Sequence, residues 1–515
     1  MKHVGRSDFL KLITAAAGGS ALRRLAPGLT RSAAESAARP NILLIVFDAT
    51  SATNMSLHGY PRPTTPNLER LAERAIVYHN HYANGNFTSS GTASLLSGML
   101  PWTHRAMGHS ATVLNAMEER NVFTLLQPKY FTAAATQNEW ANLLLHQMSR
   151  HINQHLPKSA LGLIRDPIRD WYFRNDAVAA FRTYQGILGQ QPPNVPNALV
   201  LSFVLGGISE RWLDALPQSA DDPGFAQPGM FEAYTVRAAM AAFLAQLEGL
   251  RSAEKSYFAY YHFLFPHDPY CPGLHFTDFF LDDGITWRHK RAHTLSQGSA
   301  EAGIVSDRRR YDEYLANIDA EFGRLMDDLD ARGLLDNTFV FLTSDHGEMF
   351  ERGEIGHNTA LLYEPVVRIP LLVWPPGRAS RQDIFALTSN VDILPTLLGM
   401  AGLDIPGWCE GRPLPGLGGA EDPSRGVFVV EAKATSANRP LRRATVALVN
   451  EDYKLIRYKG YVGRYADYYE FYELGDDREE MKNLAESGGA PKVFRRMQDE
   501  LLTRWAEADR PFGGS

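Results

Sequence analysis

Cysteine is nearly absent from this chain: its 515 residues include only two, Cys271 and Cys409. Two cysteines cannot form a disulfide scaffold, and no C-x-x-C metal-binding pattern is present. The sequence leaves open whether they form one disulfide or remain two unpaired, buried thiols. Stability must therefore come from a hydrophobic core, and a chain of this length with 44% hydrophobic residues can bury a large one.

An excess of one charge is also lacking, since the formal net charge is −6 and both signs are interspersed. No basic tract suggests binding to nucleic acid or to an anionic membrane surface. No stretch reaches the roughly 18 uninterrupted apolar residues that indicate a transmembrane helix. We expect no nucleic-acid partner and no transmembrane helix, and the sequence leaves the oligomeric state open.

The N-terminus has the layout of an export signal. Positive charges within the first six residues precede a modest apolar stretch at 10–22, and small residues follow up to Ala38. The string GRSDFLKL resembles a twin-arginine signal, with Ser7 in the place of the second arginine. We expect residues 1–38 to be a degenerate signal of this type and the mature protein to be periplasmic or extracellular. The alternative is a disordered tail on a cytoplasmic protein.

Apolar runs and helical periodicities alternate along the rest of the chain. Continuous apolar runs, typical of strands buried on both faces, occur at 41–47, 130–136, 198–204, 257–265, 338–343 and 371–374. Helices are expected at 65–75, 231–250 and 307–332, and a mostly helical insertion at 139–189. Further on, strands are expected at 427–431, 445–450 and 453–458, with a final helix at 491–506. This order predicts a large α/β core followed by a smaller antiparallel appendage.

A run of hydroxyl residues, Thr88-Ser89-Ser90, opens an apolar pattern that predicts a short buried helix. A hydroxyl at a helix start lies where free N–H groups and the positive end of the helix dipole converge. An attacked phosphate or sulfate group would be held at such a place. Thr88 is therefore a candidate nucleophile. The alternative is that one of the three hydroxyls merely caps the helix.

Candidate metal ligands and proton donors follow three of the expected strands. Asp48 ends the first strand, His267 follows another within PHDPY, and Asp345 and His346 follow a third, with His357 eleven residues beyond His346. Open α/β sheets bind their ligands beyond the carboxyl ends of the strands. An adjacent Asp and His offer a hard oxygen and a borderline nitrogen, a common pair for Mn²⁺ or Zn²⁺. His267 suits a substrate contact or a proton donor; the alternative is a turn histidine with no role.

The insertion contains a second histidine pattern. His151 and His155 are four residues apart and could hold a metal on one face of a helix. No acidic residue nearby completes a ligand set, so a solvated helix face is the preferred interpretation.

Taken together, these residues resemble the sulfatase branch of the alkaline phosphatase superfamily. The landmarks are RPNILLIVFD, HGYPRPTTPNLERLA, TASLLSGMLP, HFLFPHDPY, TFVFLTSDHGE, GHNTALLYEPVVRIPLLV, VDILPTLLGMAGL and YYEFYELGDDREEMKNLA. The resemblance implies an alkaline-phosphatase-like sandwich with a large mixed, mainly parallel sheet between helices. We assign residues 39–406 to this catalytic domain and 407–515 to a C-terminal, four-stranded antiparallel subdomain.

Two departures separate the chain from the sulfatases that oxidise their nucleophile to formylglycine. Those enzymes need Cys or Ser where this chain has Thr88, and threonine cannot become formylglycine. They also carry two consecutive aspartates after the first strand, whereas Ala49 follows Asp48 here. In both respects the chain resembles the phosphoethanolamine and phosphoglycerol transferases, which use an unmodified threonine and one transition-metal ion.

The resemblance implies one divalent metal ion held by Asp48, Thr88, Asp345 and His346. This mixture of oxygen and nitrogen ligands favours Mn²⁺ or Zn²⁺, while the hard oxygens also allow Ca²⁺ or Mg²⁺. A metal bound beside the threonine would lower the pKa of its hydroxyl, which is otherwise a poor nucleophile at neutral pH.

The expected function is therefore a hydrolase or transferase that cleaves a phosphodiester or phosphomonoester through a covalent phosphothreonine at Thr88. His267 or His357 would bind an ester oxygen or protonate the departing alcohol. The substrate would be a small molecule or a lipid- or glycan-linked ester. Two alternatives remain: a sulfate-ester hydrolase that works without formylglycine, and a non-catalytic binding protein on the same fold.

Overall fold

The computed structural model describes residues 39–108, 111–161 and 235–513, together with a few isolated residues between 162 and 234. The expected export signal at 1–38, the strand expected at 198–204 and the end of the expected insertion lie outside these ranges. Cys271 and Cys409 are both free thiols, so they form no disulfide, and both are half-buried rather than buried.

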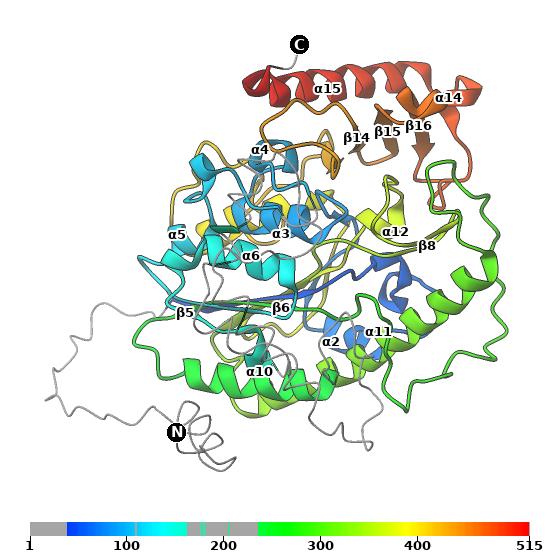
Figure 1. Ribbon diagram of the computed structural model, residues 1–515. Helices are drawn as coiled ribbons and strands as arrows, with labels where there is room; N and C mark the ends of the chain where they lie inside the picture. The colour runs from blue at the N-terminus through cyan, green and yellow to red at the C-terminus, as the bar shows by residue number, and fades with distance from the viewer. Residues whose placement is uncertain are drawn as a thin grey trace, which may run out of the picture. The chain divides into compact units, whose positions relative to one another are not determined.

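An eight-stranded sheet forms the centre of the fold and has helices on both faces (Figure 1). Its order is β11-β2-β10-β7-β1-β6-β4-β5. The strands are β1 (Asn41–Phe47), β2 (Ile76–Tyr78), β4 (Phe131–Thr136), β5 (Gln154–His155), β6 (Tyr257–Phe263), β7 (Thr338–Thr343), β10 (Leu371–Trp374) and β11 (Gln382–Ile384). β1 runs parallel to β6 and β7, whereas β10 is antiparallel to both of its neighbours. The predicted mixed, mainly parallel sheet is confirmed.

The continuous apolar run of β1 is explained by burial on both faces. Leu43, Ile45 and Phe47 pack in a core cluster with α2 (Pro66–Ala72), α10 (Val236–Leu250) and α11 (Glu301–Ala331). The alternate residues of β1 pack in a second cluster on the opposite face. That second cluster also contains residues of α3 (Thr88–Ser97), α5 (Val122–Leu126), α6 (Glu139–Gln147) and α13 (Ile393–Met400).

The register of the central strands brings their carboxyl ends to one edge of the sheet. Phe47 of β1 pairs with Phe263 of β6, and Val46 pairs with Thr343 of β7. Residues that directly follow β1 and β7 therefore lie side by side, as an open α/β sheet requires of its ligand site.

Helix boundaries differ from the expected ones where periodicity gives no signal. α11 begins at Glu301 rather than near 307, because its first turns contain few buried residues and so lack a visible apolar stripe. Thr65 occupies the N-cap position of α2, but its side chain makes no capping hydrogen bond. Asp319 of α11 does so instead, accepting hydrogen bonds from the N–H groups of Asn67 and Leu68 at 2.8 Å each.

The insertion after β4 is less helical than predicted in its described part. α6 ends at Gln147, His151 closes a short 3₁₀ turn, and His155 lies in the edge strand β5. His151 contacts Glu119 and Gln127 rather than sharing a helix face with His155. The prediction that one helix carries both histidines is therefore wrong. The chain leaves α6 after Gln147 and then adds the edge strand β5 to the sheet.

The C-terminal part forms the predicted four-stranded antiparallel sheet. Its sheet has the order β13-β14-β15-β16, with strands β13 (Val427–Glu431), β14 (Ala444–Val449), β15 (Tyr453–Lys459) and β16 (Asp467–Glu473). α15 (Pro491–Asp509) lies over it at the top of Figure 1 and packs Met497, Leu501 and Trp505 against its core.

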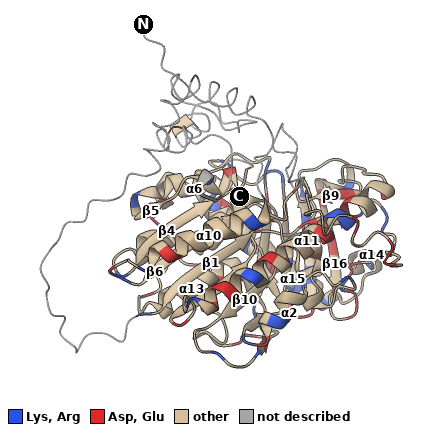
Figure 2. Ribbon diagram, turned by 90° about the horizontal axis from the view of Figure 1, so that it is seen from below, with Lys and Arg blue, Asp and Glu red and all other residues tan. Residues whose placement is uncertain are grey.

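The remaining short elements are β3 (His81–Tyr82), β8 (Met349–Glu351), β9 (Glu354–Gly356), β12 (Thr388–Ser389), α4 (Pro101–His104), α12 (Glu364–Val367) and α14 (Leu484–Ser487). Acidic and basic residues are interspersed over the helices seen from below in Figure 2, as the balanced composition suggests. Within the described part of the chain, no helix has the length and apolar content needed to cross a membrane.

Candidate active site

The helix that begins at Thr88 is not capped by its own hydroxyl residues. Phe87 occupies the N-cap position in an extended conformation and makes no side-chain cap, while Ser90 Oγ donates to the Phe87 carbonyl at 2.9 Å. Gly91 allows the helix start to lie directly against the loop after β7, because a Cβ there would be 2.1 Å from the Asp345 carbonyl oxygen. Thr88 thus does not occupy the N-cap position, and its side chain is fully buried.

Two buried carboxylates from adjacent strand ends each have one oxygen held by the protein and one left without a partner. Asp48 Oδ2 accepts from His262 Nε2 at 3.2 Å and from Asn138 Nδ2, and Asp345 Oδ1 accepts from the N–H groups of Ala49 and His346 at 3.2 and 3.0 Å. Asp48 Oδ1 and Asp345 Oδ2 have no hydrogen-bond partner among the described residues. A buried carboxylate oxygen without a donor is costly unless a cation satisfies it.

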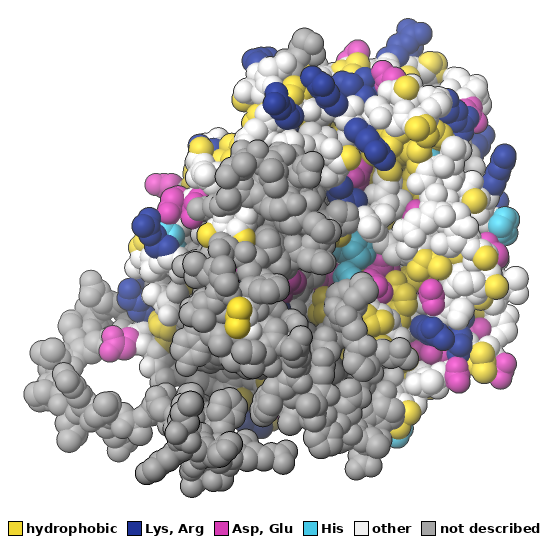
Figure 3. Space-filling model, in the orientation of Figure 1, with side chains coloured by type: hydrophobic (Ala, Val, Ile, Leu, Met, Phe, Trp, Pro, Cys, Tyr) yellow, Lys and Arg dark blue, Asp and Glu magenta, His cyan; other side chains and the backbone are white. Residues whose placement is uncertain are grey.

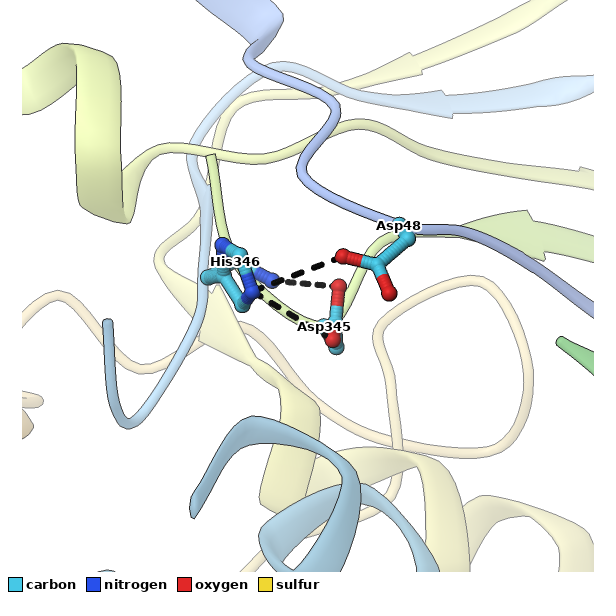
Figure 4. A group of neighbouring side chains, drawn as sticks. All are labelled: Asp48, Asp345 and His346. Atoms are coloured by element: carbon cyan, nitrogen blue, oxygen red, sulfur yellow. Dashed lines mark hydrogen bonds and ion pairs between the residues drawn. The ribbon is translucent and has the colours of Figure 1, made fainter. Parts of the chain in front are cut away.

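His346 presents a lone pair to these two oxygens. Its Nδ1 lies 3.0 Å from the Gly347 carbonyl oxygen, which can only accept a hydrogen bond, so Nδ1 carries the proton and Nε2 is unprotonated in the neutral ring. Nε2 lies 3.6 Å from Asp48 Oδ1 and 3.5 Å from Asp345 Oδ2 (Figure 4). Thr88 Oγ1 is 3.4 Å from the same nitrogen.

These four atoms fit a divalent cation. Asp48, Asp345 and His346 form a buried group whose ligand atoms all lie within 4.8 Å of one another. Tetrahedral ligands that share one ion at about 2.1 Å are separated by roughly 3.4 Å, close to the spacings around His346 Nε2. The structure therefore brings together the three predicted ligands, with Thr88 in reach as a fourth.

The electrostatics of the two carboxylates also suit a cation. Burial and the nearby charge of Asp48 raise the pKa of Asp345. Burial acts in the same direction on Asp48, but the hydrogen bond from His262 and the charges of His267 and His262 outweigh it and lower the pKa of Asp48. A bound divalent cation would remove the repulsion that raises the pKa of Asp345.

Two residues of the site escaped the sequence analysis. His262 lies within β6, opposite Val46, and it was hidden by the apolar character of that strand. Asn138 caps α6 with its Oδ1 and points its Nδ2 toward Asp48 and Thr88 Oγ1, the latter at 3.3 Å. Its position after β4 is the signal that could have found it, because β4 ends at the same edge of the sheet as β1.

The two predicted proton donors lie beside the ligand cluster. The ring of His357 is 4.2 Å from that of His346 and 4.8 Å from that of His267, measured between ring centroids. His357 Nδ1 lies 2.9 Å from the buried Glu348 Oε1, which fixes the orientation of the ring, and burial raises the pKa of Glu348 well above its ordinary value.

His267 is the more exposed of the pair, and its charge is stabilised by neighbours. Burial alone lowers the pKa of His267, but the hydrogen bond to Asp268 and the charges of Asp48, Asp268 and Glu348 raise it well above its ordinary value. His267 Nδ1 lies 2.9 Å from Asp268 Oδ1. Histidine and acidic side chains reach the surface near the middle of the face in Figure 3.

The fold and the site define an α/β ester hydrolase with an alkaline-phosphatase-like architecture. A family model described as Sulfatase matches residues 40–403, and one described as N-sulphoglucosamine sulphohydrolase, C-terminal, matches residues 353–507. The chain belongs to the sulfatase family.

Known proteins of similar sequence and structure agree with this assignment. Choline-sulfatase from Rhizobium meliloti is 24% identical over 481 residues, which cover 88% of this chain and 84% of that protein. Arylsulfatase A from Homo sapiens is 26% identical over 383 residues, covering 71% of this chain and 65% of that protein. The structure of a phosphonate monoester hydrolase from Agrobacterium radiobacter has a TM-score of 0.64 at 18% identity, covering 91% of this chain and 96% of that one, and shows the same fold.

Proposed function

We propose that this protein is a metal-dependent hydrolase or transferase that cleaves phosphoesters through a covalent phosphothreonine on Thr88. The observation that carries the proposal is the position of Thr88 Oγ1, at the first residue of a buried helix and 3.4 Å from His346 Nε2. Because threonine cannot be oxidised to an aldehyde, its own hydroxyl oxygen would be the attacking atom.

The residues that would hold the cation are Asp48, Asp345, His346 and Thr88, through the four atoms described above. A mixed set of carboxylate, imidazole and hydroxyl ligands suits Mn²⁺ or Zn²⁺ best. When bound, the cation would supply Lewis acidity, favouring the ionised hydroxyl and offsetting negative charge on the ester.

Other groups of the chain would orient the hydroxyl and the ester. Asn138 Nδ2 donates to both Asp48 Oδ2 and Thr88 Oγ1, so it points the nucleophile toward the carboxylate and favours the ionised oxygen. The helix α3 begins at Thr88, so the positive end of its dipole lies at the nucleophile and favours a negatively charged oxygen there.

His267 would act as the general acid. The hydrogen bond to Asp268 favours the protonated ring and raises the pKa of His267, so it can give a proton to the departing alcohol oxygen as the phosphorus–oxygen bond to that alcohol breaks. His357, oriented by Glu348, would donate a hydrogen bond to a non-bridging oxygen. Water or an acceptor hydroxyl then attacks the phosphorus and returns a proton to His267 as the bond to the Thr88 oxygen breaks, which completes hydrolysis or transfer.

The charges around Thr88 favour a transferred group with a single negative charge. The two carboxylates would balance one divalent cation, which leaves His267 as the main additional positive charge near the ester. A phosphodiester has one negative charge, whereas a phosphomonoester has about two at neutral pH. Sulfate esters and phosphonate monoesters also carry one negative charge, and the names of the relatives described above refer to these two kinds of ester.

Sulfate-ester hydrolysis is the second candidate, and membership of the sulfatase family favours it. It requires turnover without formylglycine, since Thr88 stands at the nucleophile position. The two candidates differ in the adduct that they leave on the protein, which is a phosphate in one case and a sulfate in the other.

The deciding experiment compares chromogenic esters on the purified full-length protein with added Mn²⁺, Zn²⁺, Mg²⁺ or Ca²⁺. We expect bis(p-nitrophenyl) phosphate to be turned over faster than p-nitrophenyl phosphate or p-nitrophenyl sulfate, with Mn²⁺ or Zn²⁺ giving the highest rate. Acid quench and peptide mass spectrometry should find a phosphate on Thr88. Turnover of the sulfate ester alone, or a phosphate on Ser89 or Ser90, would contradict the proposal.

Metal binding is tested separately with Asp345→Asn. Replacing one oxygen of this carboxylate by an amide nitrogen weakens a hard-cation site while conserving shape. Metal content measured by plasma emission spectrometry and ester turnover should fall together. Full metal occupancy with normal turnover in this variant would exclude Asp345 as a ligand.

A further inference from the structure

We propose that Lys433, from the C-terminal subdomain, is a positioning residue. It holds residues 84–88, the nucleophile segment that ends at Thr88, against residues 357–361, the His357 loop. This inference rests on the proposed function, because the two segments carry its nucleophile and one of its histidines. Lys433 lies two residues beyond the end of β13, at the start of the connection to β14.

Asn86, two residues before Thr88, is the point where the two segments meet. Its Nδ2 donates to the carbonyl oxygens of Thr359 and His357 at 2.8 and 3.3 Å. Its Oδ1 accepts from Lys433 Nζ at 3.0 Å. With all three bonds in place the amide cannot rotate by half a turn, because that would set its Oδ1 against the two carbonyl oxygens.

Lys433 joins both segments at once. Its Nζ donates to Asn86 Oδ1 and also to the Thr359 carbonyl oxygen at 3.1 Å, and it lies 3.7 Å from Glu431 Oε1. The side chain is only 11% exposed. A buried ammonium group needs such partners. Removal of the Lys433 ammonium would leave Asn86 Oδ1 without its donor and loosen the contact between the two segments.

The connection to the chemistry is short. Phe87, between Asn86 and Thr88, has the Lys433 ammonium 5.6 Å from its ring centre, and its ring packs against those of His346 and His357 at 6.4 and 5.7 Å between centroids. A shift of Asn86 would therefore be passed to the nucleophile and to the rings beside it. Misplacement of reacting groups by about 1 Å can cost on the order of a hundredfold in rate.

A neighbouring contact shows that the C-terminal sheet already anchors this segment. Asn84 Nδ2 donates to the Phe428 carbonyl oxygen at 2.9 Å, and the Val430 N–H donates to the Asn84 carbonyl oxygen at 2.8 Å. Both partners belong to β13. Asn84 fixes the start of the nucleophile segment, and Lys433 would fix its position relative to the His357 loop.

The test compares Lys433→Met with Lys433→Arg in the full-length protein, with Arg442→Met as the control. Arg442 is an exposed cation on the same β13–β14 connection, so its loss changes the net charge equally. Two properties are measured: kcat and KM with bis(p-nitrophenyl) phosphate, and hydrogen–deuterium exchange of peptides covering 84–88 and 357–361. Lys433→Gln, which keeps one amide donor, replaces Lys433→Met if the latter does not fold.

For Lys433→Met we expect kcat to fall about ten- to a hundredfold with KM changed less than about threefold, and exchange to rise in both peptides and not elsewhere. Lys433→Arg should recover most of kcat, and Arg442→Met should match the wild type. Unchanged kcat with unchanged exchange would overturn the proposal, as would faster exchange across the whole chain, which indicates a purely structural role. If the wild type cleaves no ester, the proposed function fails, while the exchange measurement still decides whether Lys433 holds the two segments together.

Discussion

At the scale of single residues, the chemistry of Thr88 depends on what surrounds its hydroxyl. The group is buried, receives a hydrogen bond from Asn138, and lies near an imidazole nitrogen and two carboxylate oxygens that lack donors. An exposed threonine elsewhere in the chain has the same side chain but none of these neighbours. The environment, rather than the residue type, makes this hydroxyl a candidate nucleophile.

Replacement of Thr88 by its nearest analogues separates chemistry from packing. Thr88→Val keeps the shape and removes the hydroxyl, so phosphodiester turnover should fall on the order of 10⁴-fold or more, as expected when a nucleophile is lost. Thr88→Ser keeps the hydroxyl and should retain a measurable rate and a phosphate adduct. Rates and intact-protein mass before and after acid quench provide the measurement. Equal rates for Thr88→Val and the wild type would exclude Thr88 as the nucleophile.

If His267 is the general acid, the loss of rate on its replacement should depend on the leaving group of the ester. His267→Ala should reduce cleavage of an alkyl phosphodiester by about 10²-fold or more, but have much less effect on a p-nitrophenyl ester, whose leaving group needs no proton. His275→Ala, an exposed histidine on the same loop, is the control. A loss of equal size for both esters would argue against proton donation.

The pH dependence of this reaction follows from the sign of the pKa shift. Because the pKa of His267 is raised, its protonated acid form persists to higher pH than in an unperturbed histidine, and the rate should fall as pH rises through that higher pKa. The alkaline fall in rate for the alkyl ester should disappear in His267→Ala. If it persists unchanged in the variant, another group titrates.

At the scale of secondary structure, α3 and the loops around it are placed by contacts that are distant in sequence. Gly91 lets the helix touch the loop after β7, and Asn84 and Asn86 tie its approach to β13 and to the His357 loop. All of these contacts join residues that are far apart in the sequence. They act by fixing the ends of a short helix against two other parts of the molecule.

The junction between α2 and α11 offers a stability test. Asp319→Ala removes the acceptor of two backbone N–H groups at the start of α2, so the free energy of unfolding should fall by about 2 kcal/mol. Asp327→Ala is the control: its bonds to Arg70 on the same helix pair lie between half-exposed side chains and contribute little. Urea titration of both variants measures the difference. An effect of equal size in the two would contradict the capping role of Asp319.

At the scale of the whole molecule, burial of ionisable groups on α11 makes stability depend on pH. Burial raises the pKa of Asp312 to about 6 against an ordinary value of 3.8, despite its bonds from Tyr60 and Arg62. The folded protein thus binds this proton more tightly than the unfolded chain. The resulting stabilisation is complete below about pH 4 and is lost as pH rises through about 6.

The expected change for this one group is on the order of 3 kcal/mol. It is isolated by comparing wild type with Asp312→Asn, measuring the free energy of unfolding by urea titration at several values between about pH 4 and 6.5. The variant should lack the decrease with rising pH that Asp312 contributes, whatever its absolute stability. Parallel curves for the two proteins would show that Asp312 is ionised throughout this range.

Much of the fold could be predicted from the sequence because the sheet is buried on both faces. β1, β7 and β10 were found at their observed bounds, since a continuous apolar run between polar turns is typical of a strand in such a sheet. The start of α11 and the edge strand β5 were not predicted. Their residues carry no periodic signal, and their conformations depend on packing against elements far away in the sequence.

The amino-acid sequence was sufficient to predict the class of this protein and to find the ligand-type residues at its strand ends, including Asp48, Asp345 and His346. These features are local: an apolar run makes a strand, and a polar residue follows it. Which of these candidate residues share one site became visible only in the folded chain. It added His262 and Asn138, separated His151 from His155, and left one oxygen of each carboxylate without a donor. These contacts depend on strand register and on close approach across the sheet, and neither can be predicted from neighbouring residues in the sequence.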